Sequence, residues 1–195
     1  MGKLPRDPER LRSIIEAFVP LPKNAKGLIK SAIRDNDPVI FCEHKLLYSR
    51  EGDVPEESYA IPFGEANVVR EGGDATIVTY GRMVHYATEA AEKLVKDGIE
   101  AEVIDLRTTS PLDEETILES AGRTGRVVVV DEANPRCSIA TDISALIAQR
   151  AFHSLKAPIE MVTAPHTPTP FAGVLEDMYI PSAQQIADAV LKVRG

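Results

Sequence analysis

Polar side chains gather at four places where an apolar, strand-like run of the sequence ends. They are His85 after the run 75–80, the segment 105–111, the pair Asp131-Glu132, and His166 after the run 159–163. The carboxyl ends of parallel strands meet at one edge of an open sheet, and ligands bind there. Strands at these runs would bring carboxylates and imidazoles together for acid–base chemistry.

Each of these groups also has a structural interpretation. Asp131 and Glu132 could act as an acid–base pair, but we expect them to form an ion-pair network with Arg136 that holds their loop. His85 falls in the first turn of a predicted helix. It either bonds to backbone there or reaches an active site at a subunit boundary.

Each of the other histidines also has a structural or a functional interpretation. His44 directly follows the apolar run 39–42, so it is a candidate site residue at a strand end. His153 lies near the end of a predicted helix, where a positive charge is favoured. His166 lies in a proline-rich loop and is either a surface group or a site residue. The sequence alone selects no Ser/His/Asp triad.

Common cofactor and metal motifs are absent. Gly81 begins no glycine-rich phosphate loop, because the second and third glycines of those patterns are missing, so it predicts a tight strand-to-helix turn. No CxxC or His-x-His spacing indicates a zinc site. We expect Cys42 and Cys137 to be reduced thiols.

Composition excludes other classes of protein. The net charge of −8 over 195 residues argues against nucleic-acid binding, which needs clustered Lys and Arg. No apolar run reaches the length of a transmembrane helix, and the N-terminus lacks the apolar core of a signal peptide, so we expect a cytoplasmic protein.

Regular alternation of strands and helices begins near residue 73. It predicts a mostly parallel sheet with helices on both faces, with the apolar run 127–130 as a central strand. Gly98 should end the first helix, and Asp113 should open the second. The predicted strands are 75–80, 101–105, 126–131 and 159–163, and the predicted helices are 84–96, 113–121, 139–151 and 182–193.

The first 72 residues follow a different pattern. Helical spacing of Leu11, Ile14, Ile15 and Phe18 predicts a helix over 9–19. A second helix should begin with Asn24 as its N-cap and end at the segment 35–38, before a short buried strand over 39–42. The stretch 48–73 has little periodicity and several Gly and Pro residues, so it predicts a linker.

Six segments, in order, resemble one known family. The chain is similar to the beta subunit of the thiamine-diphosphate-dependent first component of acetoin and 2-oxo acid (pyruvate) dehydrogenase complexes. The match covers about residues 24–195, and the segments 131–137 and 164–171 are most similar to the acetoin branch. The segments are AKGLIKSAIRDNDP (25–38), EHKLLY (43–48), IPFG (61–64), VIDLRTTSPL (103–112), DEANPR (131–136) and LEDMYIP (175–181).

This resemblance implies an α/β fold of the transketolase C-terminal type, a three-layer sandwich, over 73–195. Residues 1–48 are then the last part of a pyrimidine-binding domain, and 49–72 are a linker. The family's glutamate and histidine that face thiamine precede every segment matched here. We therefore assign no catalytic and no cofactor-contacting residue, and we expect a truncated or divergent chain that lacks most of the N-terminal domain.

The resemblance also implies partners and ions. An alpha subunit would hold thiamine diphosphate and magnesium in the intact enzyme, and a lipoyl acyltransferase core would dock on the C-terminal domain, which also forms a homodimer. Glu176 and Asp177 are the candidate docking residues. A potassium ion, held by carbonyl and carboxylate oxygens, is implied at the turn of Ala32, Ile33, Asp35 and Asp37.

The function implied is the C-terminal part of an acetoin dehydrogenase beta subunit, which serves assembly and acyl transfer to lipoyl groups. The isolated chain should be inactive. Three alternatives stay open: a pyruvate or other 2-oxo acid dehydrogenase beta subunit, a non-catalytic oligomerisation module, and a transketolase-like or deoxyxylulose-phosphate-synthase-like domain. The last would need basic residues around Arg82 and Arg107 for a sugar phosphate.

Overall fold

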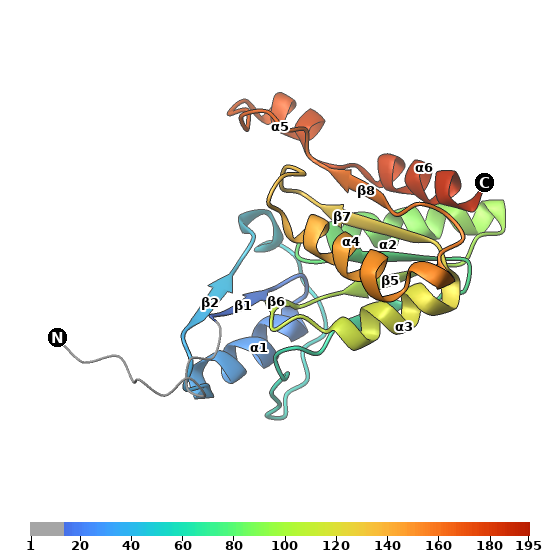
Figure 1. Cartoon of the computed structure of the whole chain (residues 1–195). Helices are drawn as coiled ribbons and strands as arrows, with labels where there is room; N and C mark the ends of the chain where they lie inside the picture. Colours follow the sequence, from blue (N-terminus) through green and yellow to red (C-terminus); the bar gives the residue numbers. More distant parts are fainter. Residues whose placement is uncertain (1–13) are drawn as a thin grey trace.

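The computed structural model describes residues 14–195 (Figure 1). Its N-terminal part contains β1 (Ile15–Phe18), α1 (Pro22–Arg34), β2 (Val39–Cys42) and the short 3-10 helix η2 (Lys45–Leu47). The later strands are β3 (Asn67–Arg70), β4 (Ala75–Thr79), β5 (Ala101–Asp105), β6 (Thr108–Ser110), β7 (Val127–Asp131) and β8 (Glu160–Thr163). The later helices are α2 (Met83–Leu94), η3 (Val95–Asp97), α3 (Glu114–Thr124), α4 (Ile139–Arg150), η4 (Phe152–Ser154), α5 (Gly173–Tyr179) and α6 (Ala183–Arg194).

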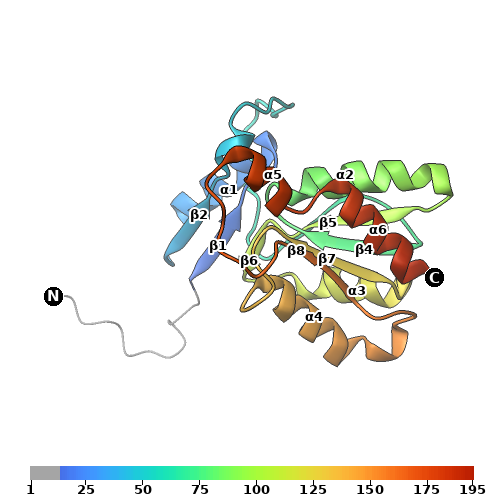
Figure 2. The same cartoon turned by 90° about the horizontal axis from the view of Figure 1, so that it is seen from above.

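A five-stranded sheet in the order β3-β5-β4-β7-β8 forms the larger part. Its last four strands are parallel, and only β3 runs antiparallel. Helices α2 and α6 cover one face of this sheet, and α3 and α4 cover the other (Figure 2). The predicted three-layer sandwich with a mostly parallel sheet is confirmed, and so are its four strands and four helices to within three residues.

The core of this sheet explains why its strands could be predicted. Every residue of β4, β5 and β7 is buried, as expected for strands covered by helices on both faces. Gly98 ends the first helical segment in a left-handed conformation with φ 68°. Asp113 caps α3 by accepting the Thr116 N–H, so both predicted helix boundaries are confirmed.

The predicted helix over 9–19 is wrong where the structure describes it. Ile15–Phe18 is strand β1, which pairs in parallel with β2 and antiparallel with β6 to give the order β2-β1-β6. Its burial alternates with a period of two, as a strand requires. Residues 9–13 of the predicted helix lie outside the described residues.

The start of α1 also differs from the prediction. Leu21 is the N-cap, and Pro22 fills the first helical turn, where its missing N–H costs nothing. Asn24 therefore lies inside the helix and is fully buried. The helix ends at Arg34, as predicted, but β2 is a partly exposed edge strand rather than a buried one.

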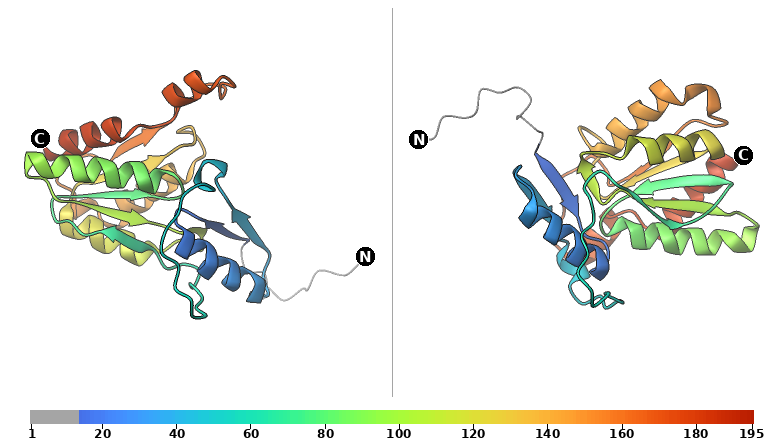
Figure 3. Two further views of the ribbon diagram at one scale, coloured as in Figure 1. Left: turned by 180° about the vertical axis from the view of Figure 1, so that it is seen from behind. Right: turned by 90° about the horizontal axis from the view of Figure 1, so that it is seen from below.

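The segment expected to be a linker contains β3, an antiparallel edge strand of the five-stranded sheet. Strand β6, inside the segment 105–111, was not predicted either, and it joins the N-terminal sheet. Figure 3 shows the two sheets side by side, connected through this segment. The division at residues 48 and 72 stays a prediction. Within residues 14–195, no helix has the length and apolar content to cross a membrane.

Two adjacent glycines give a matched test of the turn before β4. A Cβ at Gly72 would lie 2.4 Å from the backbone carbon of Ala101, whereas a Cβ at Gly73 would meet nothing within 4 Å. We expect Gly72→Ala to lower the free energy of unfolding by about 1–3 kcal/mol, because backbone must shift. Gly73→Ala should change it by less than about 0.5 kcal/mol. Urea unfolding measures both, and equal effects would contradict the close approach.

Candidate functional site

A cleft of about 310 Å³ opens at the carboxyl ends of β4 and β7. The chain leaves β4 to form β5 on one side and later returns to form β7 on the other, so the crossovers diverge between β4 and β7. This is the topological switch point, where ligands bind in open α/β sheets. The cleft is lined by Phe18, Val19, Cys42, Glu43, His44, Tyr80, Gly81, Arg82, Asp131, Glu132 and Ala133.

Asp131 and Tyr80 form the floor of this cleft. Asp131 is 1% exposed, and its Oδ1 accepts hydrogen bonds from Tyr80 Oη and from the backbone N–H of Ala133, both at 2.9 Å. Burial and the nearby Asp131 charge raise the pKa of Tyr80, so its phenol stays protonated and donates. The Phe18 ring lies edge-on against Tyr80 with 4.6 Å between centroids.

Glu132 and His44 meet across the cleft. The distance from His44 Nε2 to Glu132 Oε2 is 3.4 Å, which suits an ion pair, but Glu132 Oε2 makes no hydrogen bond with any described residue. The predicted ion-pair network with Arg136 is not formed: Glu132 faces His44, and Arg136 donates its backbone N–H to Asn134. His44 is thus the predicted strand-end histidine that reaches the cleft.

The turn after β4 and the thiol of β2 complete the walls. Gly81 has φ 57°, which confirms the predicted tight turn. Arg82 follows it, and its guanidinium donates to Tyr86 Oη at 2.5 Å. Burial, together with Glu16, raises the pKa of the Cys42 thiol, which disfavours a thiolate nucleophile. Cys42 and Cys137 are both free thiols, as predicted.

The other histidines lie outside the cleft. His85 places Nε2 2.8 Å from the Pro20 carbonyl, and burial lowers its pKa, so it links α2 to the N-terminal part in the structural role weighed above. His153 is exposed in η4 and packs against Phe152. His166 is exposed, with Nδ1 3.2 Å from Asn134 Oδ1.

A second buried carboxylate joins the two sheets. Asp105 lies at the end of β5, and its Oδ2 accepts a hydrogen bond from Asn24 Nδ2 at 3.1 Å. Its Oδ1 accepts the Arg107 N–H at 3.1 Å. Burial raises the pKa of Asp105 to about 7 against the pull of Arg107 and Asn24. The contact ties α1 to the five-stranded sheet, and it gives Asn24 a role that helix-capping rules do not suggest.

The residues around the cleft do not suit a diphosphate or a sugar phosphate. Glu43, Asp131 and Glu132 contribute three carboxylates, and Arg82 contributes the one guanidinium of the lining. The side chains of this lining therefore disfavour a phosphate anion by their net charge. Residues 14–195 also contain no group of three or more His, Cys, Asp or Glu side chains placed to hold a metal ion.

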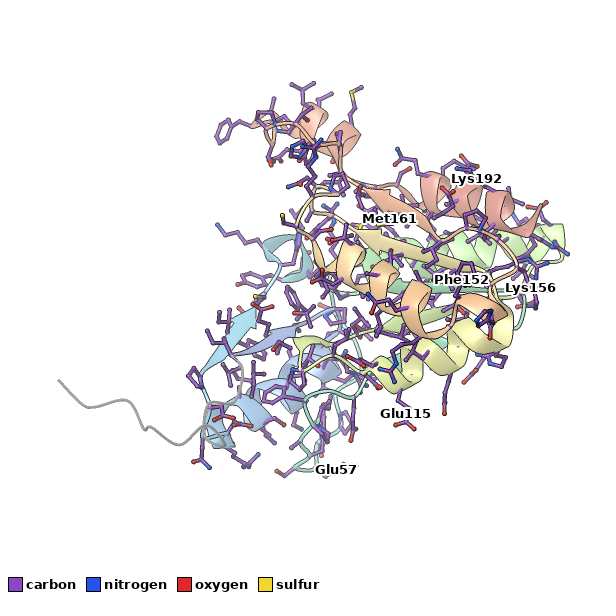
Figure 4. The ribbon with its side chains drawn as sticks, viewed as in Figure 1. Glu57, Glu115, Phe152, Lys156, Met161 and Lys192 are labelled. Atoms are coloured by element: carbon purple, nitrogen blue, oxygen red, sulfur yellow. The ribbon has the colours of Figure 1, made fainter. Side chains whose placement is uncertain are left out.

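The predicted docking residues lie on a projecting helix. Glu176 and Asp177 are exposed on α5, which stands away from the body beyond β8 in Figure 1. Glu176 also lines a second cavity of about 460 Å³, which shares His44, Arg82 and Glu132 with the cleft. We call residues 171–178 the arm, and Figure 4 shows side chains that extend from it into open space. Its exposed apolar residues are Phe171, Val174, Leu175 and Met178.

The turn predicted to hold potassium closes α1. The Asp35 N–H caps the helix by bonding to the Ser31 carbonyl, and Asp35 Oδ1 accepts the Asp37 N–H at 2.9 Å. Asp35 and Asp37 border a cavity of about 600 Å³ together with Ser31 and Arg34. Ala32 and Ile33 lie in the last turn of α1, where carbonyl groups lack intrahelical partners. The ion site itself stays a prediction.

Sequence reasoning missed Tyr80 as a member of the cleft, and it considered Arg82 only for a sugar-phosphate site. Both flank Gly81 at the end of β4, so their position at a strand end was the available signal. Asp131 and Glu132 were selected for that reason and do line the cleft.

Comparison with known proteins gives consistent findings. The family described as "Transketolase, C-terminal domain" matches residues 64–186. Among solved structures, one described as a split-gene transketolase, an inactive beta4 tetramer, superposes with a TM-score of 0.74. It is 26% identical and covers 93% of this chain and 57% of its own.

Curated relatives are more similar in sequence. The acetoin:2,6-dichlorophenolindophenol oxidoreductase subunit beta of Cupriavidus necator is 69% identical over 171 residues, 88% of this chain and 51% of its own. The protein of that name in Bacillus subtilis is 53% identical over 89% of this chain and 51% of its own. The pyruvate dehydrogenase E1 component subunit beta of Bacillus subtilis is 50% identical over 92% and 55%. The chain spans about half the length of these relatives.

Proposed function

Because the chain belongs to the transketolase C-terminal domain family, we propose that it is the C-terminal part of an acetoin dehydrogenase beta subunit. In this role it serves subunit assembly, while the thiamine chemistry is performed elsewhere in the intact enzyme. The observation that carries the proposal is the 69% identity to an acetoin-oxidising relative over 88% of the chain. The parallel sheet with helices on both faces agrees with it.

The alternative substrate class is pyruvate or another 2-oxo acid. The pyruvate relative is 50% identical, so the identity of 69% favours acetoin. A sugar-phosphate site near Arg82 and Arg107 is disfavoured, because Arg82 lies beside three carboxylates and Arg107 is half-buried next to Asp105. A non-catalytic oligomerisation module would assemble through the same exposed surfaces, but the assembled protein would have no enzyme activity.

Partners and ions belong to the same proposal. The alpha subunit would hold thiamine diphosphate and magnesium, since the acidic cleft of this chain does not suit a diphosphate. The exposed arm 171–178, which carries Glu176 and Asp177 among its apolar residues, supports docking of a homodimer partner or of a lipoyl acyltransferase core. Potassium at the turn 32–37 rests on oxygen ligands and on the cavity beside it, and thermal unfolding in potassium against sodium chloride tests it.

A chimera tests the proposed function. Residues 14–195 replace the matching half of the Cupriavidus necator beta subunit, which is expressed with its own alpha subunit. We expect a heavier species in sedimentation and acetoin-dependent dichlorophenolindophenol reduction. Pyruvate-dependent reduction instead would favour the 2-oxo acid alternative, and assembly without either activity would favour the oligomerisation module. The isolated chain should neither bind thiamine diphosphate tightly nor turn over, and tight binding would contradict this assignment.

A further inference from the structure

The described part of the chain has three buried carboxylates, and one differs from the others. Glu102 is 2% exposed, and its two oxygens accept from Ser120 and Arg123. Asp105 has a partner for each oxygen, Asn24 and Arg107. Asp131 uses only Oδ1, and its buried Oδ2 has no hydrogen-bond partner within residues 14–195.

A buried carboxylate oxygen without a donor is costly, and such an oxygen beside a cleft is a reason to look for a ligand. Glu132 Oε2 lies in the same wall and is also buried without a hydrogen bond, although His44 is 3.4 Å away. Two carboxylate oxygens and one donor, Arg82 Nη1, thus lack a hydrogen bond at the topological switch point, and the unpaired acceptors are the larger group.

The charges of the side chains that line the cleft favour a cationic ligand. Glu43, Asp131 and Glu132 outnumber the single guanidinium of Arg82, and the Cys42 thiol and Tyr80 phenol are held neutral by burial. Phe18 and Tyr80 also line the cleft, and their apolar ring atoms suit a ligand with a short alkyl chain.

We propose that this cleft binds a small organic cation, with a primary ammonium or guanidinium group donating to Asp131 Oδ2 and Glu132 Oε2. The cation replaces His44 as the partner of Glu132, whose Oε2 is buried beside the His44 ring. A volume of about 310 Å³ holds such a head group with a chain of a few carbons. The test of this site needs no enzyme activity.

The test is a titration of the isotope-labelled full chain with n-butylammonium and n-butylguanidinium chloride, followed by NMR at constant ionic strength. The Ala133 amide bonded to Asp131 and the His44 ring should shift together, with a Kd on the order of 1 mM. Sodium chloride alone and n-butanol should leave both unshifted.

Variants decide whether the acceptors named here bind the cation. Glu132→Gln and Asp131→Asn should each raise Kd by about 10-fold or more, since each removes a charge-assisted hydrogen bond. In the Asp131→Asn variant the new amide oxygen can still accept from Tyr80 and Ala133, so the fold is expected to persist. Glu115→Gln, on the outer side of α3 in Figure 4, is the matched control and should leave Kd unchanged.

Three results would overturn the proposal. The first is no shift beyond the salt control, which means that Asp131 Oδ2 has water or nothing as its partner. The second is binding that both variants leave intact. The third is tighter binding of n-butyrate than of n-butylammonium, which would make Arg82 the recognition group and the ligand an anion.

Discussion

Asn24→Asp is expected to remove most of the stability of the folded chain at neutral pH. Asn24 Nδ2 donates to Asp105 Oδ2 at 3.1 Å, and both residues are fully buried. The substitution keeps the shape but exchanges a donor for a second carboxylate, and two buried carboxylates at this distance cannot both ionise. We expect the free energy of unfolding at pH 7.5 to fall by about 3–5 kcal/mol, measured by urea denaturation with circular dichroism.

Two controls separate repulsion from the lost hydrogen bond. Asn24→Ala removes the donor without adding charge and should cost about 1–3 kcal/mol. Asn24→Asp should recover more stability than Asn24→Ala as the pH is lowered toward 5. Protonation of Asp105 stabilises both variants, but only a protonated carboxyl at position 24 can also donate to its neighbour. An Asn24→Asp chain as stable as its parent at pH 7.5 would show that Asn24 and Asp105 are not in contact.

The parallel sheet could be predicted because its signal is local. The strands β4, β5 and β7 are short apolar runs between helices that have their own periodicity, and Gly98 and Asp113 mark helix ends chemically. The strand β1 could not be predicted from its own four residues. Apolar positions in so short a segment fit a helix or a strand, and its partner β6 lies about 90 residues away, where Thr109 bonds to Glu16.

The candidate site could also be predicted only as far as its signals are local in the sequence. Strand ends selected Asp131, Glu132 and His44 one at a time, because position in a parallel sheet is a local inference. Their meeting in one cleft depends on how the N-terminal sheet docks on the larger one, which no spacing encodes. Asn24 shows this most clearly: capping rules place it at a helix start, but its partner Asp105 is 81 positions away, and that contact decides its role.

The same docking contact should make stability depend on pH. The pKa of Asp105 is raised from 3.8 to about 7, so the folded state holds a proton that the unfolded state releases at lower pH. The contribution of this proton to the free energy of unfolding is therefore fully present below pH 3.8. It is lost as the pH rises toward 7, and it stays lost above pH 7. The loss is about 4 kcal/mol over this window. Arg107 and Lys23 face the carboxyl and reduce the shift.

Asp105→Asn should abolish this pH dependence. The amide oxygen that the substitution introduces can still accept the Arg107 N–H. A flip of the Asn24 amide then lets Asn24 Oδ1, which has no partner among the described residues, accept from the introduced amide nitrogen. Above pH 7 the variant should therefore be more stable than its parent, and the difference should shrink toward pH 4.

Urea unfolding of both chains from pH 4 to 8 isolates Asp105, because the other carboxylates cancel in the difference between the two free energies of unfolding. The parent should lose stability relative to Asp105→Asn as the pH rises, since only the parent has a proton to lose at this position. A difference that does not change with pH would mean that Asp105 is ionised throughout, and that the Asn24 contact holds a charge rather than a proton.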